Sequence, residues 1–465
     1  MRKWYNGIQN SCKDPCQNLR SLFGVRYNGS EPWCRASTQC TILGELCYVF
    51  VSLISLTRLG TNGQTPAAEP KLISSAWLAG WHTANATPTF DLYNISWSKY
   101  TDLYFSFALP TANTSELSLD GSNGDILPSF VQQAHANGVN AHVSVGGWGG
   151  SIYFSTAVGS AENRTQFVKV ITDFATNYSL DGINFDWEYP NHQGIGCNIV
   201  NANDTENFLT FLQELRADPI GSNLTLSAAT ALTPFFDANG TALTNVSAFA
   251  EVFDFITVMN YDVWGSWSTG VGPNAPLNDS CAAKPNQQGS AVSAVSAWFA
   301  AGMPVEKIVL GVASYGHSFR VNQTSAFVSG STTELAAYPA FNASDFPLGD
   351  SWDTGATEPD ACGLLENNGG VFDFWSLIEN GYLDEQGNFT SAVAHRFDEC
   401  SQTPYLYVED SELMISFDNA QSFAAKGSFI QDYGLAGFAM WEAGGDSNDI
   451  LLDAIRSTVG FEDDC

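Results

Sequence analysis

Residues 181–190 read Asp-Gly-Ile-Asn-Phe-Asp-Trp-Glu-Tyr-Pro, with a polar side chain at every second position from Asn184 to Glu188. Successive side chains of a β-strand point to opposite faces, so Asn184, Asp186 and Glu188 share one face and the apolar side chains between them share the other. Two neighbours on that face lie about 6.5 Å apart at Cα, so the two acids can hydrogen-bond each other or one bound group. A row of carboxylates cannot be buried against helices without strong compensation. The segment therefore predicts a strand end that lines a polar cavity.

Around this segment the chain alternates short apolar runs with amphipathic stretches, which predicts repeated βα units and a parallel sheet. Eight strands are expected, at residues 73–81, 103–107, 141–146, 182–188, 224–229, 255–261, 308–314 and 436–441. Apolar residues recur at helical spacing in 162–174, 205–216 and 291–301. Acidic side chains at a strand end are typical of a (β/α)8 TIM barrel, whose active site lies at the C-terminal ends of the strands. The predicted fold class is therefore α/β.

The connection between the seventh and eighth expected strands is about 120 residues long, far more than one βα connection needs. A small inserted domain is expected there, at residues 319–407. Residues 71–318 and 408–465 are then assigned to the barrel. A chain of 465 residues suits this organisation, because a barrel of about 250 residues leaves room for insertions.

Acidic side chains outnumber basic ones, with 49 Asp and Glu against 18 Lys and Arg and a net charge of −31. Nucleic-acid binding depends on neutralising phosphates with Lys and Arg, so this balance argues against a nucleic-acid partner. A neutral or cationic polymer fits such a protein, because the charge would steer a cationic chain toward it. Alternatively, the charge only keeps the protein soluble.

The N-terminal segment 1–70 is expected to be an extension that is absent from the mature chain. Its apolar run at 46–56 follows basic residues and is typical of the core of a signal peptide, being too short to span a bilayer comfortably. The mature chain is expected to begin near residues 64–71. Asn-x-Ser/Thr glycosylation sites recur between residues 85 and 390, which is typical of a protein that follows the secretory route. We therefore expect a secreted, extracellular protein without stable membrane association. The alternative is a signal-anchor that tethers the protein to a membrane.

Five cysteines follow residue 60, an odd number that leaves one of them unpaired. A Cys362–Cys400 disulfide would lie within the inserted segment, and a Cys197–Cys281 disulfide would join loops after two successive strands. Cys465 would then be the free thiol. None of the five forms a CxxC pair and the six His residues form no ligand-spaced cluster, so we expect neither a metal nor another cofactor.

Segment 181–190 resembles the signature DGxDxDWEYP of glycoside hydrolase family 18, the chitinases. Every fixed position of the signature matches except Asn184, where the family has Asp. Residues 144–148, Ser-Val-Gly-Gly-Trp, resemble the SxGG motif of the family, in which a glycine such as Gly147 lets a substrate approach the backbone. Residues 259–262, Met-Asn-Tyr-Asp, resemble its MxYD motif.

The resemblance extends over residues 71–460 and has consequences for the fold. Residues 315–317 read Tyr-Gly-His where the family usually has Tyr-Gly-Arg, so the substrate contact of that Arg does not carry over. In family members with a deep cleft, an α+β insertion lies between the seventh and eighth strands and walls one side of the groove. The resemblance therefore implies a TIM barrel with a small α+β insertion between strands 7 and 8.

The resemblance also implies a substrate-assisted mechanism, which family 18 uses in place of the usual pair of catalytic carboxylates. Asp186 and Glu188 come from one strand, so no second carboxylate is placed to attack the sugar. Glu188 is expected to protonate the glycosidic oxygen and then act as base for water. Asp186 is expected to hold and stabilise the 2-acetamido group, whose carbonyl attacks the anomeric carbon, and Tyr261 to bind the carbonyl oxygen.

Sugars stack their apolar faces on aromatic rings, and the motifs supply such rings together with polar contacts. Trp441 matches the floor residue of the family, Phe107 its aromatic residue beside the reactive sugar, and Trp148, Trp267 and Trp81 are candidates for neighbouring subsites. The complete expected substrate-binding set is Trp441, Trp148, Gly147, Met259, Asp262, Phe107, Trp81, Trp267 and Tyr315.

Asn184 is expected to change the titration of its neighbour. An Asp at this position would repel a charge on Asp186 and make the two share protons, whereas a neutral amide can only hydrogen-bond. A less coupled titration of Asp186 and a shifted pH optimum follow.

The function expected from these residues is that of a secreted, monomeric, fungal-type chitinase that cuts β-1,4 linkages within chitin or chitooligosaccharides. One alternative is a chitin-binding lectin on the same fold, although lectins of this family typically lack the acid that Glu188 supplies. The other is an endo-β-N-acetylglucosaminidase acting on N-glycans, although such enzymes generally lack the long insertion.

Overall fold

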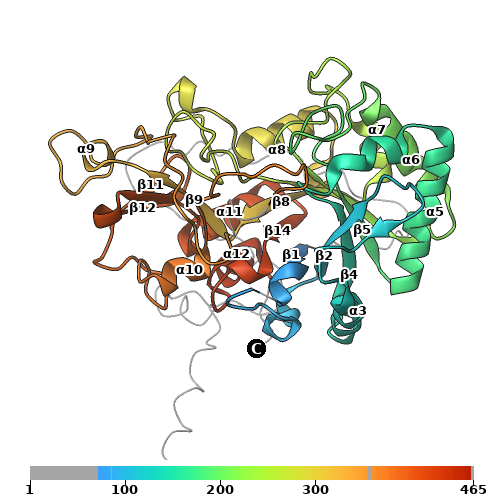
Figure 1. Ribbon diagram of the computed structural model, residues 1–465, viewed down its shortest axis with the longest axis horizontal. Coiled ribbons are helices and arrows are strands. Elements are labelled where there is room, and N and C mark those ends of the chain that lie inside the picture. The colour runs from blue at the N-terminus through green and yellow to red at the C-terminus, as the bar shows by residue number, and fades with distance from the viewer. Residues whose placement is uncertain (1–71, 85, 354–358, 462–465) are drawn as a thin grey trace, which may run out of the picture. The chain divides into compact units, whose positions relative to one another are not determined.

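A closed barrel of parallel strands forms the centre of the computed structural model, which describes residues 72–84, 86–353 and 359–461. Each strand pairs in parallel with the next, and the first also pairs with the last (Figure 1). In chain order the barrel strands are β1 (Ile73–Ala79), β2 (Asp102–Pro110), β4 (Asn140–Gly146), β5 (Gly182–Asp186), β6 (Thr225–Thr230), β7 (Phe255–Val258), β8 (Ile308–Ala313) and β14 (Gly437–Trp441). The short strand β3 (Leu117–Ser118) pairs antiparallel with the end of β2. The predicted fold class is thereby confirmed.

Every predicted barrel strand overlaps an observed one, but several end earlier than expected. β5 ends at Asp186 and β7 at Val258, so Glu188 and Tyr261 lie on the loops that follow. β1 ends at Ala79, and Trp81 belongs to a short 3-10 helix. The polar and apolar alternation continues past the last ladder hydrogen bonds, which is why the sequence pattern overestimates strand length.

Helices form the outer layer of the barrel (Figure 1). They are α3 (Leu127–Ala136), α4 (Phe154–Val158), α5 (Ala161–Tyr178), α6 (Asp204–Ala217), α7 (Ser247–Val252), α8 (Ala291–Ala300), α11 (Ala420–Tyr433) and α12 (Ile450–Val459). The three predicted helices correspond to α5, α6 and α8. The first and last of these begin at serine N-caps, because the Ser160 and Ser290 hydroxyls accept hydrogen bonds from backbone N–H groups of the first turn.

Short 3-10 helices complete the connections, at Gly80–Thr83, Leu92–Asn94, Trp97–Lys99, Gly124–Ile126, Ser151–Tyr153, Gly221–Asn223, Lys284–Asn286, Val305–Lys307, Glu409–Ser411 and Ala443–Gly445. In the part of the chain that the structure describes, no helix combines the length and the apolar character that crossing a bilayer requires.

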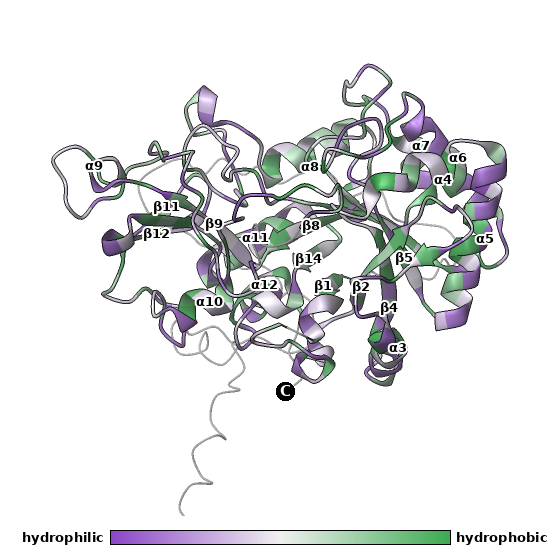
Figure 2. Ribbon diagram, viewed as in Figure 1, coloured by the Kyte–Doolittle hydropathy of each residue, from purple (hydrophilic) through white to green (hydrophobic). Residues whose placement is uncertain are grey.

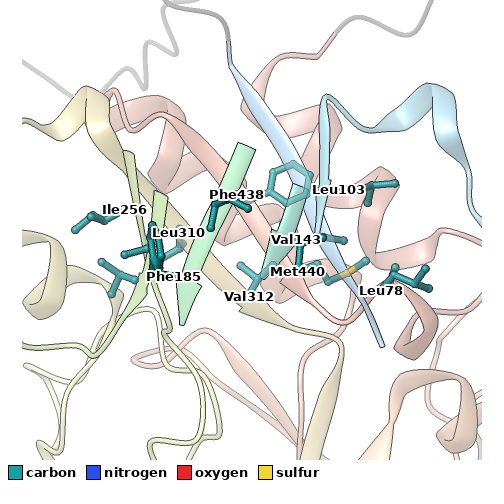
Figure 3. Close-up of a cluster of buried hydrophobic side chains, with 14 of the residues drawn as sticks. Leu78, Leu103, Val143, Phe185, Ile256, Leu310, Val312, Phe438 and Met440 are labelled. Atoms are coloured by element: carbon teal, nitrogen blue, oxygen red, sulfur yellow. The ribbon is translucent and has the colours of Figure 1, made fainter. Parts of the chain in front are cut away.

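The main core fills the space between the strands and the surrounding helices. Outward-facing side chains of different strands, among them Leu78, Leu103, Val143, Phe185 and Phe438, meet there (Figure 3). Phe185 packs edge to face against Phe208 and Phe211 of α6. The helices alternate hydrophobic and hydrophilic residues, as α5 shows in Figure 2. The apolar face predicted for segment 181–190 therefore packs against helices, and its polar face points into the barrel.

The chain between β8 and β14 forms a second, antiparallel sheet. Its strand order is β10 (Val371–Asp373), β9 (Tyr315–Arg320), β13 (Leu413–Ser416), β12 (Thr403–Val408) and β11 (Ala394–Asp398), with the short helices α9 (Gln323–Ala326) and α10 (Phe374–Glu379) in its connections. Three of its strands contribute Phe319, Tyr407 and Met414 to a separate apolar cluster. The predicted limits 319 and 407 each fall within a strand of this sheet, because β9 follows β8 after a single residue and β13 returns to pair with β9.

Two disulfides correct the predicted cysteine pairing. Cys197 pairs with Cys362 and Cys281 with Cys400, whereas we expected Cys362–Cys400 and Cys197–Cys281. Each bond joins a barrel loop to the segment between β8 and β14, so neither lies within one part of the chain. The expectations for residues 1–70, including the apolar run 46–56, and for Cys465 lie outside the described residues.

Candidate active site

A cleft of about 810 Å³ opens at the C-terminal ends of the barrel strands. Its walls come from the ends of β1, β2, β4, β5, β6, β7 and β14 and from the loops that follow them. The site residues expected from sequence that line it are Glu188, Asp186, Tyr261, Trp441, Trp148, Met259, Asp262, Phe107 and Trp81. Parallel strands bring their carboxyl ends to one edge of the barrel, which explains how motifs far apart in the sequence meet here.

Asp186 is the last residue of β5 and lies opposite Gly146 of β4. Its backbone oxygen accepts hydrogen bonds from the Gly147 N–H, at 2.8 Å, and from the Ser151 hydroxyl, at 3.1 Å. Its side chain is buried, and the Oδ1 atom has no hydrogen-bond partner among the described residues. Burial raises the pKa of Asp186 to about 7. The backbone is thus fixed while one carboxyl oxygen remains available to a ligand.

Glu188 lies two residues further along and lines the same cleft. Burial raises the pKa of its carboxyl well above the ordinary value, and the negative charge of Asp186 raises it further. A hydrogen bond with the Tyr189 side chain acts in the opposite direction. A carboxyl that holds its proton to higher pH in a cleft has the property of a general acid.

Asn184 is completely buried and lies below the cleft, not in its lining. Its Oδ1 atom accepts a hydrogen bond from the Ser144 hydroxyl at 2.7 Å, and its Nδ2 atom donates to the Ser227 hydroxyl at 3.0 Å. The indole N–H of Trp77 in turn donates to Ser144 at 3.3 Å. Both ends of the amide are therefore engaged by neighbouring strands, and any influence on chemistry must pass through Asp186 above it.

Tyr261 faces Asp186 and Glu188 from the loop after β7. Burial raises the pKa of its hydroxyl well above the ordinary value, and the charges of Asp186 and Asp262 raise it further. The hydroxyl therefore stays protonated and can donate a hydrogen bond. Met259 lines the cleft from the same loop.

Asp262 adopts a positive φ of 55° and links this loop to β9. Its Oδ1 atom accepts a hydrogen bond from the Tyr315 hydroxyl at 2.7 Å and lies 2.8 Å from His317 Nε2. The side chain that replaces the usual Arg thus contacts a carboxylate of the MxYD-like motif. Tyr315 does not line the cleft, because its hydroxyl is used by Asp262 and its ring is buried.

Aromatic rings gather around the acids. Phe107 and Trp441 stack with ring centroids 5.5 Å apart and planes 17° apart, and Trp81 lies 6.0 Å from Phe107 and 6.3 Å from Trp441. The buried Trp77 contacts Trp441 from below, at 5.9 Å. These rings give the cleft an apolar surface suited to the faces of sugar rings.

Three other expected residues take different positions. Trp148 lines the cleft with about half of its surface exposed, 49%. Trp267 is even more exposed, lies outside the lining, and touches the edge of His317 with ring centroids 5.3 Å apart. Gly147 is not a lining residue either, but its φ is +82° and a Cβ there would come within 2.7 Å of the Phe107 ring. It allows a close approach between two strands.

Several other lining residues were not predicted from the sequence. His192 and Phe236 stack with centroids 4.9 Å apart and, with Tyr189, form the wall beyond Glu188. Tyr189 directly follows Glu188 within segment 181–190, and His192 follows that segment closely. Their proximity to Glu188 is the signal that points to them. Gly146, from the SxGG-like motif, also lines the cleft. The remaining lining residues missed are Leu109, Asp120, Gly121, Ser122, Gly149, Gly150, Ala231, Leu232, Thr233, Gln288 and Ala361.

Comparisons with known proteins point to one family. The model of the family "Glycosyl hydrolases family 18" matches residues 76–446. A chitinase-like effector of Moniliophthora roreri is 53% identical over 398 residues, which cover 86% of this chain and 95% of that protein. Chitinase A1 of Niallia circulans is 28% identical over 334 residues, which cover 68% of this chain and 42% of that protein.

Among solved structures, the crystal structure of a chitinase from Rhizomucor miehei superposes with a TM-score of 0.74 at 33% sequence identity. The match covers 83% of this chain and 99% of that chain. The family match extends over most of the residues that build the barrel and its cleft. The chain therefore belongs to glycosyl hydrolase family 18.

Proposed function

We propose that this protein is a chitinase that hydrolyses β-1,4 linkages within chitin or chitooligosaccharides. The observation that carries the proposal is the placement of Glu188, whose raised pKa keeps it protonated, beside Asp186 in a cleft walled by Trp441, Trp81 and Phe107. Family membership supports the substrate class, since the similar proteins include chitinases.

In the proposed mechanism Glu188 donates its proton to the glycosidic oxygen of a bound N-acetylglucosamine unit. The bond from that oxygen to the anomeric carbon breaks while the 2-acetamido carbonyl oxygen attacks the same carbon, which forms an oxazolinium ion. Asp186 accepts a hydrogen bond from the acetamido N–H and stabilises the positive charge, and Tyr261 donates one to the carbonyl oxygen. Glu188, now ionised, removes a proton from a water molecule as the water oxygen attacks the anomeric carbon from the side that the leaving group vacated. The bond from that carbon to the acetamido oxygen breaks, the 2-acetamido group is restored, and the configuration is retained.

Intramolecular attack explains why a single strongly placed acid is sufficient. The nucleophile and the electrophile belong to one molecule, so the cleft need only hold the acetamido arm in a reactive geometry. The unpartnered Asp186 Oδ1 atom supports this assignment, because a buried carboxylate oxygen without a partner is costly unless a ligand supplies one. Substrate binding is assigned to Trp441, Trp81, Phe107 and Trp148 in the cleft.

The test is turnover of a chitotriose reporter and of longer chitin oligomers by the purified protein. Glu188→Gln should abolish turnover while chitin-oligomer binding persists, because the amide keeps the shape of the acid but has no proton to give. Asp120→Asn is the matched control, since it changes another carboxylate of the lining and should leave most of the activity. Wild-type activity below detection on all oligomers would contradict the proposal. The products of long oligomers also report whether cuts fall within the chain.

A chitin-binding protein without turnover is the alternative of a different class. Two observations favour keeping it: the similar protein of Moniliophthora roreri is called a chitinase-like effector, and Asn184 and His317 depart from the usual family residues. Binding of chitin oligomers without any turnover in the wild type would support it. Cleavage of N-glycans in place of chitin would instead support an endo-β-N-acetylglucosaminidase.

We also propose that the protein is secreted and acts as a monomer. Disulfides form and persist in oxidising compartments, and the structure contains two. Detection of the protein in culture medium, and its elution volume in size-exclusion chromatography, test the two statements.

A further inference from the structure

The backbone of Glu188 is held from both sides by buried polar side chains. Its N–H donates to the Ser151 hydroxyl at 2.9 Å. Its carbonyl oxygen accepts a hydrogen bond from the Asn198 side-chain amide at 2.7 Å. Ser151 is completely buried and Asn198 is 7% exposed. Because β5 has already ended, these two bonds take over from the sheet in fixing the position of Glu188.

The loop that carries Asn198 packs directly onto the same carbonyl. The side chain of Gln193 accepts from the Asn198 N–H at 3.1 Å and donates to the Asn198 carbonyl at 3.2 Å, so the loop is closed on itself. Gly194 lies against the Glu188 carbonyl so closely that a Cβ there would come within 2.0 Å of the oxygen. The Asn198 amide therefore reaches Glu188 from a loop with a defined shape.

This loop is also covalently joined to the segment between β8 and β14. Cys197, the neighbour of Asn198, forms the disulfide with Cys362. Ala361, beside that cysteine, lines the cleft and lies 3.5 Å from the place where a Cβ of Gly149 would be. The disulfide therefore connects a cleft-lining segment of the insertion to the loop that holds the Glu188 carbonyl.

We propose that Asn198 is a positioning residue for Glu188 and that the Cys197–Cys362 disulfide holds Asn198 in place. The inference rests on the proposed function, in which Glu188 is the proton donor. Removing the Asn198 amide leaves a buried carbonyl without its donor, and the turn that carries Glu188 then shifts to find another partner. The rings proposed to stack on sugars, Trp441 and Trp81, come from β14 and from the 3-10 helix that follows β1, so their positions do not depend on this loop.

The expected signature is a fall in kcat without a matching rise in KM. Asn198→Ala and the near-isosteric Asn198→Leu both remove the donor, and each should lower kcat by roughly ten- to a hundred-fold, the effect of a small misplacement of a catalytic group. KM for a chitotriose reporter should stay within about two-fold, because ground-state binding is retained. The alkaline limb of the pH-rate profile should move, since the environment of the Glu188 carboxyl changes.

The second disulfide provides a matched control. The double variant Cys197→Ser/Cys362→Ser should lower kcat in the same selective way but less than Asn198→Ala. The double variant Cys281→Ser/Cys400→Ser also cuts one bond between barrel and insertion, yet it leaves the Asn198 loop intact and should keep the wild-type kcat. Thermal unfolding and chitin-oligomer binding show which variants are folded. Folded Asn198 variants with wild-type kcat and pH profile, or equal kcat losses in the two disulfide variants, would overturn the inference.

Failure of the proposed function is a separate outcome. If the wild type turns over no chitin oligomer, kcat cannot report on position, and crystal structures of the wild type and of Asn198→Ala take its place. A displaced Glu188 carboxyl in the variant would support the positioning role of Asn198. An unchanged carboxyl would refute it.

Discussion

The two consecutive inward-facing side chains of β5, Asn184 and Asp186, differ in how far their hydrogen-bonding groups are paired. At the lower position, Asn184 has its oxygen bonded to Ser144 and its amide bonded to Ser227, so its layer of the barrel is satisfied from within. At the upper position, Asp186 is also buried, but its Oδ1 atom has no partner among the described residues. We infer that the lower layer stabilises the barrel and that the upper layer, as the proposed function requires, keeps its hydrogen-bonding capacity for a ligand at the expense of stability.

Replacing Asp186 should affect activity more than replacing Asn184 does, and it tests whether the upper layer takes part in the reaction. Asp186→Asn keeps the shape but removes the negative charge that, in the proposed mechanism, stabilises the oxazolinium ion. We expect kcat for a chitotriose reporter to fall by about 10²- to 10³-fold, the usual loss when one preorganised electrostatic group is removed. Steady-state kinetics check the value, and a variant within two-fold of wild type would show that Asp186 does not take part in the reaction.

Replacing Asn184 tests whether the lower layer stabilises the barrel. Asn184→Ala removes two buried hydrogen bonds and leaves the Ser144 and Ser227 hydroxyls without this partner. We expect the free energy of unfolding to fall by about 2–4 kcal/mol, from the lost bonds, the unpaired hydroxyls and the small cavity. Denaturant unfolding measures the change. Asn163→Ala, which removes a hydrogen bond from a half-buried side chain to the Thr156 carbonyl, is a milder control and should cost less.

The difference between the two layers was only partly visible in the sequence. Alternation along the strand correctly placed Asn184 and Asp186 on the inner face, because side-chain direction follows directly from strand geometry. It could not show that Ser144 stands opposite Asn184 and Gly146 opposite Asp186, because the register between strands depends on the closed barrel. The partners of each inward residue, and hence the contrast, needed the structure.

Contacts between distant loops were equally hidden. The correct cysteines were paired wrongly, because pairing depends on which loops of the barrel and the insertion meet in space. The contact from Asn198 to the Glu188 carbonyl joins residues close in sequence, but nothing in the residue types reveals that this amide folds back. Tyr315 shows the opposite case, since it has the expected motif, but its hydroxyl donates to Asp262 and its ring does not line the cleft.

The loss of stability caused by the unpartnered carboxyl of the upper layer should depend on pH. The pKa of Asp186 is about 7 in the folded protein and near the ordinary 3.8 in the unfolded chain. Between these values the folded state binds more protons than the unfolded state, so this group makes stability fall as pH rises from about 4 to about 7. Asp186→Asn should therefore be more stable than wild type by about 1 kcal/mol or more at pH 7.5, and the gain should vanish near pH 4. Thermal unfolding across this range measures the difference.

The outcome of that measurement separates two explanations. A stabilisation that is the same at pH 4 and pH 7.5 would trace to altered packing, not to the burial of a charge. Loss of stability at pH 7.5 would mean that Asp186 is already satisfied in the protein without ligand. The comparison between the layers would then fail.

The smallest effect is expected from bringing the two layers together electrostatically. Asn184→Asp places a second carboxyl directly below Asp186, and two neighbouring carboxylates cannot both ionise easily, so they share protons. The apparent pKa that governs the acidic limb of the pH profile of kcat should shift by a fraction of a unit to about one unit. The value of kcat at the optimum pH should change little. Ser227→Ala, combined with Asn184→Asp, is a useful companion, because it removes a hydroxyl that could hydrogen-bond the new carboxyl and should enlarge the shift. An unchanged pH-rate profile in both variants would show that a charge in the lower layer does not affect the titration of the upper layer. Asn184 would then be a purely structural residue.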